Sequence, residues 1–292
     1  MIDNLKKYYL FIFLQFLLWL PLFYDKVPVV KPQFLEGVDS VFAKPKNSIE
    51  SWFQGAFQTK YEQYINNSNI LRPFLVRLKN QVDFSIFNTT EAPGIIIGKQ
   101  NNLFIKSYID DYNSSNFIGK KNIDIKLSRL KILQNELKKK NIDLLVVFAP
   151  GKASFNPEFI PERFLINKKD TSNYLYMSQK AKEFKINTID FNYYFKRIKD
   201  SCSIKIYPQN GAHWTSYAVG LAADSLIKYI EKLKRIDLPD LSWNKINYTS
   251  EAKFSDDDIS RLLNLHFVPK EKKLPYPDFI FNKIGKKTLK SI

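Results

Sequence analysis

The chain has two histidines, and one of them, His213, stands beside a tryptophan in a short loop, residues 207–215. Within this loop Asn210 and Gly211 favour a tight turn, and a long predicted helix begins directly after it. A histidine at the carboxyl side of a parallel sheet is well placed to act as a general base. The alternative is a histidine that only caps or packs. We therefore take His213 as the candidate catalytic base, and Asn210 and Trp214 as candidate site residues in the same loop.

A second group of polar residues follows an apolar run over residues 144–148. The run ends in Ala149-Pro150-Gly151-Lys152, and Ser154 comes soon after. An α/β fold places functional groups at such a strand end. Lys152 is a candidate for positioning an anion or for a structural ion pair. Ser154 is a poor candidate nucleophile because no base is adjacent to it in the sequence.

Three consecutive carboxylates, Asp256 to Asp258, follow Ser255. A calcium loop of the EF-hand type needs alternate ligands, a glycine and a distal glutamate, and this spacing is not found here. We interpret the segment as a helix N-terminus capped by Ser255 or Asp256. With two histidines and one cysteine, the sequence predicts neither a metal site nor a bound cofactor.

Helical and strand-like patterns alternate along most of the chain after residue 93. The predicted helices are 123–140, 173–184 and 217–235, and the predicted strands are 94–98, 103–105, 144–148, 187–191 and 204–207. Alternation of helices with buried strands is typical of an α/β domain with a parallel sheet.

The chain carries 45 lysine and arginine residues against 29 acidic residues, a formal charge of +16. The lysines are dispersed, and the sequence holds no zinc-finger spacing, RNP signature or glycine-rich phosphate loop. We therefore expect no nucleic acid partner. The anionic partners that remain are a membrane surface or an acidic polysaccharide, and the alternative is a solvated surface without a specific ligand.

The N-terminus predicts an uncleaved signal anchor, with a cleaved signal as the alternative. Lys6 and Lys7 precede an apolar run over residues 8–24, and about 17 residues is near the lower limit for a bilayer span. The anchor would place the rest of the chain on the extracytoplasmic (periplasmic) face of the membrane. The predicted organisation is a cytoplasmic tail (1–7), anchor (8–24), linker (25–48), helical lead-in (49–92) and α/β domain (93–292).

Three segments in a fixed order carry a resemblance to a known family. They are Gly94–Gly98 with Leu103-Phe104, Ala149–Lys152 with Pro157–Pro161, and Gly211–Thr215. Together they resemble the SGNH hydrolase-like domain of the AlgX and AlgJ alginate O-acetyltransferase proteins, the DHHW family. The resemblance implies a three-layer α/β/α fold with a mostly parallel sheet, here preceded by the N-terminal membrane helix.

The resemblance also implies a reaction, in which a serine accepts an acetyl group and passes it to a polysaccharide hydroxyl. His213 corresponds to the family's histidine, which activates that serine. The family has an aspartate two residues before this histidine, where this chain has Gly211, so Asp190 is a candidate orienter. The family's serine lies downstream in a Gly-Asp-Ser segment that this sequence does not hold, so we expect the nucleophile, and the C-terminal part of the fold, beyond Ile292.

The sequence thus predicts an extracytoplasmic acetyltransferase-like protein that acts on a cell-surface polysaccharide. Its acetyl donor would reach it through a membrane-bound, acyl-carrying partner. The alternatives are a catalytically inactive glycan-binding module and an esterase or lipase of the same fold.

Overall fold

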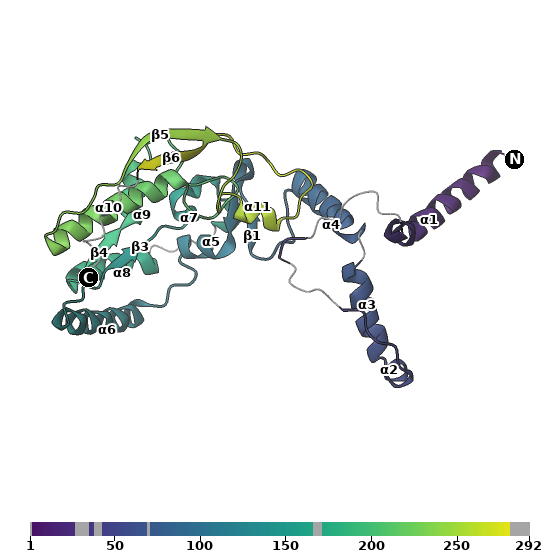
Figure 1. The fold of residues 1–292 in the computed structure, drawn as a ribbon, viewed down its shortest axis with the longest axis horizontal. Coiled ribbons are helices and arrows are strands. Elements are labelled where there is room, and N and C mark those ends of the chain that lie inside the picture. The colour runs from purple at the N-terminus through teal and green to yellow at the C-terminus, as the bar shows by residue number, and fades with distance from the viewer. Residues whose placement is uncertain (1, 27–34, 38–42, 69–70, 166–170, 281–292) are drawn as a thin grey trace. The chain divides into compact units, whose positions relative to one another are not determined.

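The computed structural model of the 292-residue chain divides into two compact units. The first comprises Met1–Glu91 with Arg261–Val268, and the second comprises Ala92–Ser260 with Pro269–Ile292. The structure describes residues 2–26, 35–37, 43–68, 71–165 and 171–280 (Figure 1).

The first unit is helical. Its elements are α1 (Ile2–Lys26), α2 (Ile49–Phe53), α3 (Ala56–Ser68), α4 (Leu71–Val82) and a π-helical turn, η1 (Asp83–Phe87). Ser48 starts α2 because its side chain accepts from the Ser51 backbone N–H in a reciprocal capping box. His266, the second histidine, belongs to this unit: its Nε2 lies 3.1 Å from the Phe74 carbonyl oxygen, and its ring packs on the Phe74 ring.

The membrane helix expected over residues 8–24 is not supported. These residues do lie in a helix, α1, but within the described ranges no helix combines the length and the apolar character that a membrane crossing requires. The physical reason lies in the run itself, which is near the lower length limit for a span and includes Gln15 and Pro21.

The second unit contains a parallel pair of strands, β3 (Val146–Phe148) and β4 (Thr188–Asp190). Because side chains alternate along a strand, Val146 and Phe148 face one side and Val147 and Ile189 the other.

Helices cover both faces of this pair. On the first side lie α6 (Lys120–Lys139) and α8 (Asn173–Glu183), with Ile123, Leu127 and Ala181 in their shared core. On the second side lie α9 (Phe191–Ile198) and α10 (Ser216–Lys234), whose core holds Phe195 and Ala218 (Figure 1). This helix–strand–helix layering is that of an α/β fold.

The sheet is less parallel than the resemblance implied. Among the described residues β3–β4 is the one parallel pair, and the other two sheets are antiparallel: β1 (Ile95–Ile97) with β2 (Leu103–Ile105), and β5 (Ser242–Thr249) with β6 (Leu274–Ile280). The strand expected over 204–207 does not form, because two of its carbonyl groups bind Thr215 and not a neighbouring strand. The Lys205 and Ile206 oxygens accept hydrogen bonds from the Thr215 hydroxyl and backbone N–H.

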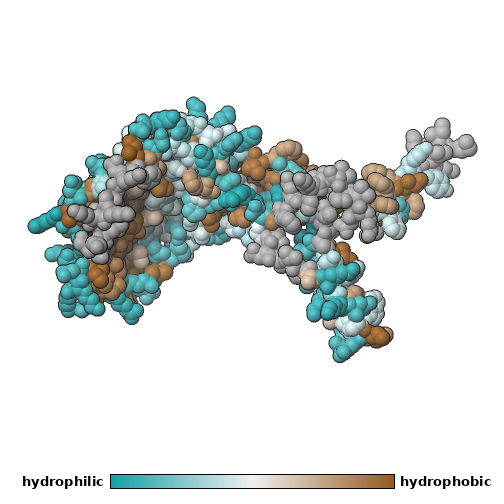
Figure 2. All heavy atoms as spheres, viewed as in Figure 1, coloured by the Kyte–Doolittle hydropathy of each residue, from teal (hydrophilic) through white to brown (hydrophobic). Residues whose placement is uncertain are grey.

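Short helices complete the second unit. They are α5 (Lys106–Tyr112), α7 (Lys152–Phe155) and α11 (Asp258–Leu262). The last two residues of α11 belong to the first unit. The second unit also contains three 3-10 turns, η2 (Lys99–Asn101), η3 (Pro157–Phe159) and η4 (Glu162–Phe164). Hydrophilic residues cover much of the visible surface of this unit, and apolar residues show between them (Figure 2). The exposed apolar side chains include Ile132 on α6 and Val147 on β3.

Candidate functional site

The loop that carries His213, residues 207–215, is closed at its base. The Thr215 backbone N–H donates to the Ile206 oxygen at 2.9 Å, and the Thr215 hydroxyl donates to the Lys205 oxygen at 2.7 Å. The same hydroxyl oxygen accepts from the Ala218 N–H and so caps α10. Thr215 therefore joins the end of the loop to its beginning and to the helix that follows. We call residues 207–215 the histidine loop.

His213 is paired with a carboxylate from a distant part of the chain. Its Nδ1 lies 2.7 Å from Oδ2 of Asp258, and Oδ1 of the same aspartate accepts from the Ala212 backbone N–H at 2.9 Å. With Asp258 ionised, Nδ1 carries the proton and donates it to the carboxylate, so Nε2 is left as the basic nitrogen. The His213 side chain is 61% exposed, which leaves Nε2 open to a reactant. Among the described residues no hydroxyl is hydrogen-bonded to Nε2.

Gly211 explains why the carboxylate comes from elsewhere. A Cβ at this position would lie 2.6 Å from the Asp256 oxygen and 2.7 Å from the Ser255 oxygen. Contacts that short are not tolerated against backbone atoms, so no side chain fits here. The segment that excludes a side chain at 211 is the segment that presents Asp258. The carboxylate that pairs with His213 therefore comes from a segment 45 residues away.

The contact expected from Asp190 is made instead by Asp258. Asp190 caps α9: its Oδ1 accepts from the Tyr193 N–H at 2.9 Å, and its Oδ2 accepts from the Tyr174 hydroxyl at 2.9 Å. Burial, with help from this bond, raises the pKa of the Tyr174 phenol. Asp190 therefore has a helix-capping role in the described part of the chain.

Two oppositely charged, buried side chains hold the histidine loop from within. The Lys152 ammonium, fully buried, donates to the Gln209 oxygen at 2.8 Å and to the Gly211 oxygen at 3.0 Å. Glu271, 4% exposed, accepts from the Gln209 N–H at 2.8 Å and from the Asn210 N–H at 3.3 Å. Lys152 thus binds carbonyl oxygens, and no ion pair to it is found among the described residues. Burial lowers the pKa of Lys152 to about 7.

Asn210 and Trp214 brace the loop on either side of His213. Asn210 Nδ2 donates to the Pro269 oxygen at 2.6 Å, and the Asn210 carbonyl accepts from the Ser260 N–H. Trp214 Nε1 donates to the Tyr207 hydroxyl oxygen at 2.7 Å, and that hydroxyl donates to the Pro150 oxygen at 2.6 Å.

This hydrogen-bond chain ties the histidine loop to the turn after β3. Burial raises the pKa of the Tyr207 phenol, which keeps it a donor. The Trp214 ring also packs edge-on against Phe195 in the core.

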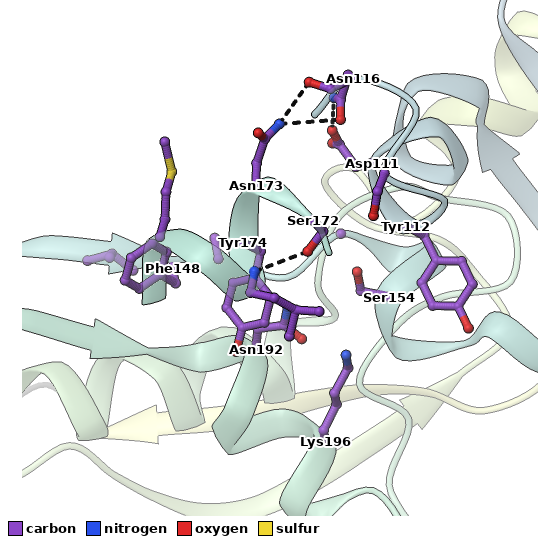
Figure 3. A pocket seen from close by; sticks show the side chains of 16 residues that line it. Asp111, Tyr112, Asn116, Phe148, Ser154, Ser172, Asn173, Tyr174, Asn192 and Lys196 are labelled. Atoms are coloured by element: carbon purple, nitrogen blue, oxygen red, sulfur yellow. Dashed lines mark hydrogen bonds between the residues drawn. The ribbon is translucent and has the colours of Figure 1, made fainter. Parts of the chain in front are cut away.

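An open cavity of about 890 Å³ lies at the carboxyl end of β3, and its lining includes Ser154 but not His213 or Asp258. Ser154 belongs to this cavity and not to the surroundings of His213. Figure 3 shows Ser154, Asn192 and Lys196 around one hollow, with Tyr112 at its rim. Asn192 is buried, and its Oδ1 has no hydrogen-bond partner among the described residues. Within the described part of the chain, no hydrogen bond joins Ser154 to His213 or Asp258.

Sequence reasoning missed Asp258, Glu271 and Tyr207 as parts of the site. The acidic pattern around Asp258 indicates only a helix start, and α11 begins at Asp258 itself, two or more residues after the predicted caps Ser255 and Asp256. The pairing with His213 crosses 45 residues, and no local pattern reports such a contact. The one local signal was Gly211 itself: the resemblance implies an aspartate at this position, so any carboxylate that orients His213 has to lie elsewhere in the sequence.

The model of one protein family matches this chain. The family, described as the SGNH hydrolase-like domain of the acetyltransferase AlgX, matches residues 95–274. Two solved structures are also similar to the chain. The O-acetyltransferase domain of Pseudomonas putida AlgJ is 15% identical, with a TM-score of 0.42, over 64% of this chain and 66% of that one. Pseudomonas aeruginosa AlgX is 17% identical, with a TM-score of 0.46, over 66% of this chain and 47% of that one. The chain thus spans less than two thirds of either structure's length, and no curated protein matches it.

Proposed function

Because the chain belongs to the AlgX-type family of SGNH hydrolase-like acetyltransferase domains, we propose that it transfers acetyl groups to hydroxyls of a polysaccharide. The observation that carries the proposal is the His213–Asp258 pair, with the Nε2 side of the ring open to a reactant. A hydroxyl becomes a nucleophile only when a base lies within hydrogen-bond reach and is itself oriented by a third group. His213 and Asp258 supply the base and the orienter.

The chemistry proceeds in two halves. In the first half, a serine oxygen attacks the acetyl carbonyl carbon of the donor while His213 Nε2 takes the serine proton. The bond between the acetyl carbon and the leaving group then breaks, and Nε2 gives its proton to the leaving group. In the second half, a sugar hydroxyl attacks the acetyl-serine while Nε2 takes the hydroxyl proton, and the serine oxygen leaves and receives that proton from Nε2. Asp258 stabilises the imidazolium that forms in each half, because a carboxylate at 2.7 Å favours the charged ring.

The proposed chemistry needs a serine as nucleophile, which the family resemblance places in a Gly-Asp-Ser segment. Residues 1–292 do not include such a segment, and residues 281–292, Ser291 among them, lie outside the described residues. Reading the gene in full, including past the codon for Ile292, checks the acyl-serine route. A Gly-Asp-Ser-like segment there supports the acyl-serine route, whereas its absence from every frame removes that route.

We also propose that the protein has an extracytoplasmic, periplasmic location and that an acyl-carrying membrane partner delivers the acetyl group. If osmotic shock leaves the protein in the cytoplasmic fraction, the proposed location is contradicted.

Acetyl transfer is tested with the full-length protein. 4-Nitrophenyl acetate serves as donor, a panel of acidic and neutral oligosaccharides (alginate included) serves as acceptor, and mass spectrometry detects acetylated product. His213→Ala should abolish transfer, and His266→Ala, which removes the other histidine from the first unit, should leave it unchanged. Release of acetate to water with no acetylated sugar would indicate an esterase, and sugar binding without turnover would indicate a glycan-binding module. Either outcome overturns the proposal.

A further inference from the structure

The peptide groups of the histidine loop are held by two buried charges of opposite sign. Lys152 binds the carbonyls of Gln209 and Gly211, and Glu271 binds the N–H groups of Gln209 and Asn210. Together they fix four backbone groups within three consecutive residues.

One of these contacts reaches the catalytic pair directly. The Gly211 oxygen and the Ala212 N–H belong to the same peptide unit. Lys152 holds the oxygen of this unit at 3.0 Å, and Asp258 holds its N–H at 2.9 Å. Because a peptide unit is rigid and planar, rotating it breaks both bonds together. The position of Lys152 is therefore coupled to that of Asp258, and through Asp258 to the His213 ring.

The burial of Lys152 needs a reason, because a buried ammonium is costly unless it is paired. In the described part of the chain no carboxylate lies within ion-pair distance of its Nζ, and the nearest aromatic contact is the Phe104 ring, 5.4 Å away. Glu271 forms its own ion pair with Lys205, at 3.0 Å. Apolar residues of similar volume often stabilise a core as well or better, and what Lys152 adds is its two hydrogen bonds to the carbonyls of the loop.

Direct participation in the reaction does not fit the geometry. Lys152 is fully buried, and its hydrogen bonds are made to backbone carbonyls. It therefore has no access to a sugar or to an acyl donor. Both the ammonium and the neutral amine carry enough hydrogens to bind two carbonyls, so the contact survives either protonation state.

We propose that Lys152 and Glu271 are positioning residues, which clamp the histidine loop from opposite sides so that His213 meets Asp258. The effect on turnover rests on the proposed function, whereas the effect on the His213 ring does not.

The test variant is Lys152→Met, which keeps the side-chain length and removes the donor. Its matched control is Lys131→Met, which removes a lysine-to-carbonyl bond of 3.0 Å to Lys185, outside the loop. Displacing a catalytic group by about 1 Å costs about 10²-fold in rate. We therefore expect Lys152→Met to lower kcat about 10²-fold with little change in KM, and Lys131→Met to change neither.

The second readout needs no activity. In the ¹⁵N-labelled protein the two histidines give two imidazole signals, and His266 is the internal reference. We expect a sharp Nδ1–H resonance from His213 in the wild type, which broadens or disappears in Lys152→Met. If the resonance is sharp in the wild type and broadens in Lys152→Met, but the wild type transfers no acetyl group, the proposed function fails and the clamp stands.

A variant that fails to fold would not end the test, because Glu271→Gln probes the same clamp. It keeps the volume of the side chain but presents an amide group to two backbone N–H donors. We expect the same broadened His213 resonance. An unchanged His213 resonance and an unchanged kcat in a folded Lys152→Met or Glu271→Gln protein would overturn the inference.

Discussion

The stability of the second unit should rise with pH because of Lys152. Burial lowers the pKa of this lysine to about 7 in the folded protein, against an ordinary value of 10.5. Between these two values the unfolded chain keeps a proton that the folded protein has released. Since stability rises with pH wherever the unfolded state binds more protons, the free energy of unfolding increases across this window and levels off above it. Below about pH 7 Lys152 is protonated in both the folded and the unfolded protein, so the folded protein bears the full free-energy cost of burying the ammonium.

The magnitude follows from the difference in pKa. One unit corresponds to about 1.4 kcal/mol, so the whole window is worth about 5 kcal/mol, and the interval from pH 7.5 to 9.5 about 3 kcal/mol. Lys152→Met abolishes this dependence, since methionine does not titrate.

Urea unfolding provides the assay. Tryptophan fluorescence, with Trp214 inside the histidine loop, reports the transition for wild type and Lys152→Met at several pH values between 7 and 9.5. All other titrations are shared by the two proteins, so they cancel in the difference between the two free energies of unfolding. From pH 7.5 to 9.5 we expect the free energy of unfolding of the wild type to rise by about 3 kcal/mol relative to that of Lys152→Met. A difference that stays constant with pH would show that Lys152 is not a buried, titrating lysine.

Three further substitutions follow from the contacts. Gly211→Ala should destabilise the second unit and slow acetyl transfer, because its Cβ would overlap the Asp256 backbone; thermal melting and rate measurements check this, and an unchanged melting temperature would contradict it. Tyr207→Phe should cost about 1–3 kcal/mol in urea unfolding, because it removes the 2.6 Å donor of the buried Pro150 oxygen and the 2.7 Å acceptor of Trp214 Nε1, which are left 3.4 Å from each other; a loss below that range would mean that these bonds are replaced. Asp190→Ala should cost about 0.5–2 kcal/mol, because it removes the N-cap of α9, but it should leave the transfer rate unchanged; a large loss of rate would restore Asp190 as the orienter.

Local features of the site could be predicted from the sequence because they depend on local patterns. The predicted helix at 217–235 is α10, Ser216–Lys234, and the Thr215 cap follows from its side-chain chemistry. The apolar run at 144–148 contains β3, which ends at the turn that holds Lys152. The motif order also led to the family whose model matches residues 95–274.

The remaining features depend on contacts between distant segments. Asp258 and Glu271 approach the histidine loop across 45 and about 60 residues, and their neighbours in sequence give no sign of this partnership. The segment 204–207 has a strand-like apolar pattern, but its carbonyls are taken by Thr215, and only the closed loop shows this. Lys152 was expected at the site, and its partners are backbone oxygens, which no side-chain pattern can indicate.

The pairing of His213 with Asp258 as the base of acetyl transfer is tested most directly by Asp258→Asn, measured alone and combined with His213→Ala. Asparagine keeps the shape of the side chain but cannot stabilise the imidazolium, and a loss of this type lowers kcat by about 10⁴-fold. We predict that loss for Asp258→Asn, and no further loss in the double variant beyond His213→Ala alone, since residues that act as a unit are not additive. Transfer by Asp258→Asn at a rate within about threefold of the wild type, a difference of under 1 kcal/mol, would contradict the account.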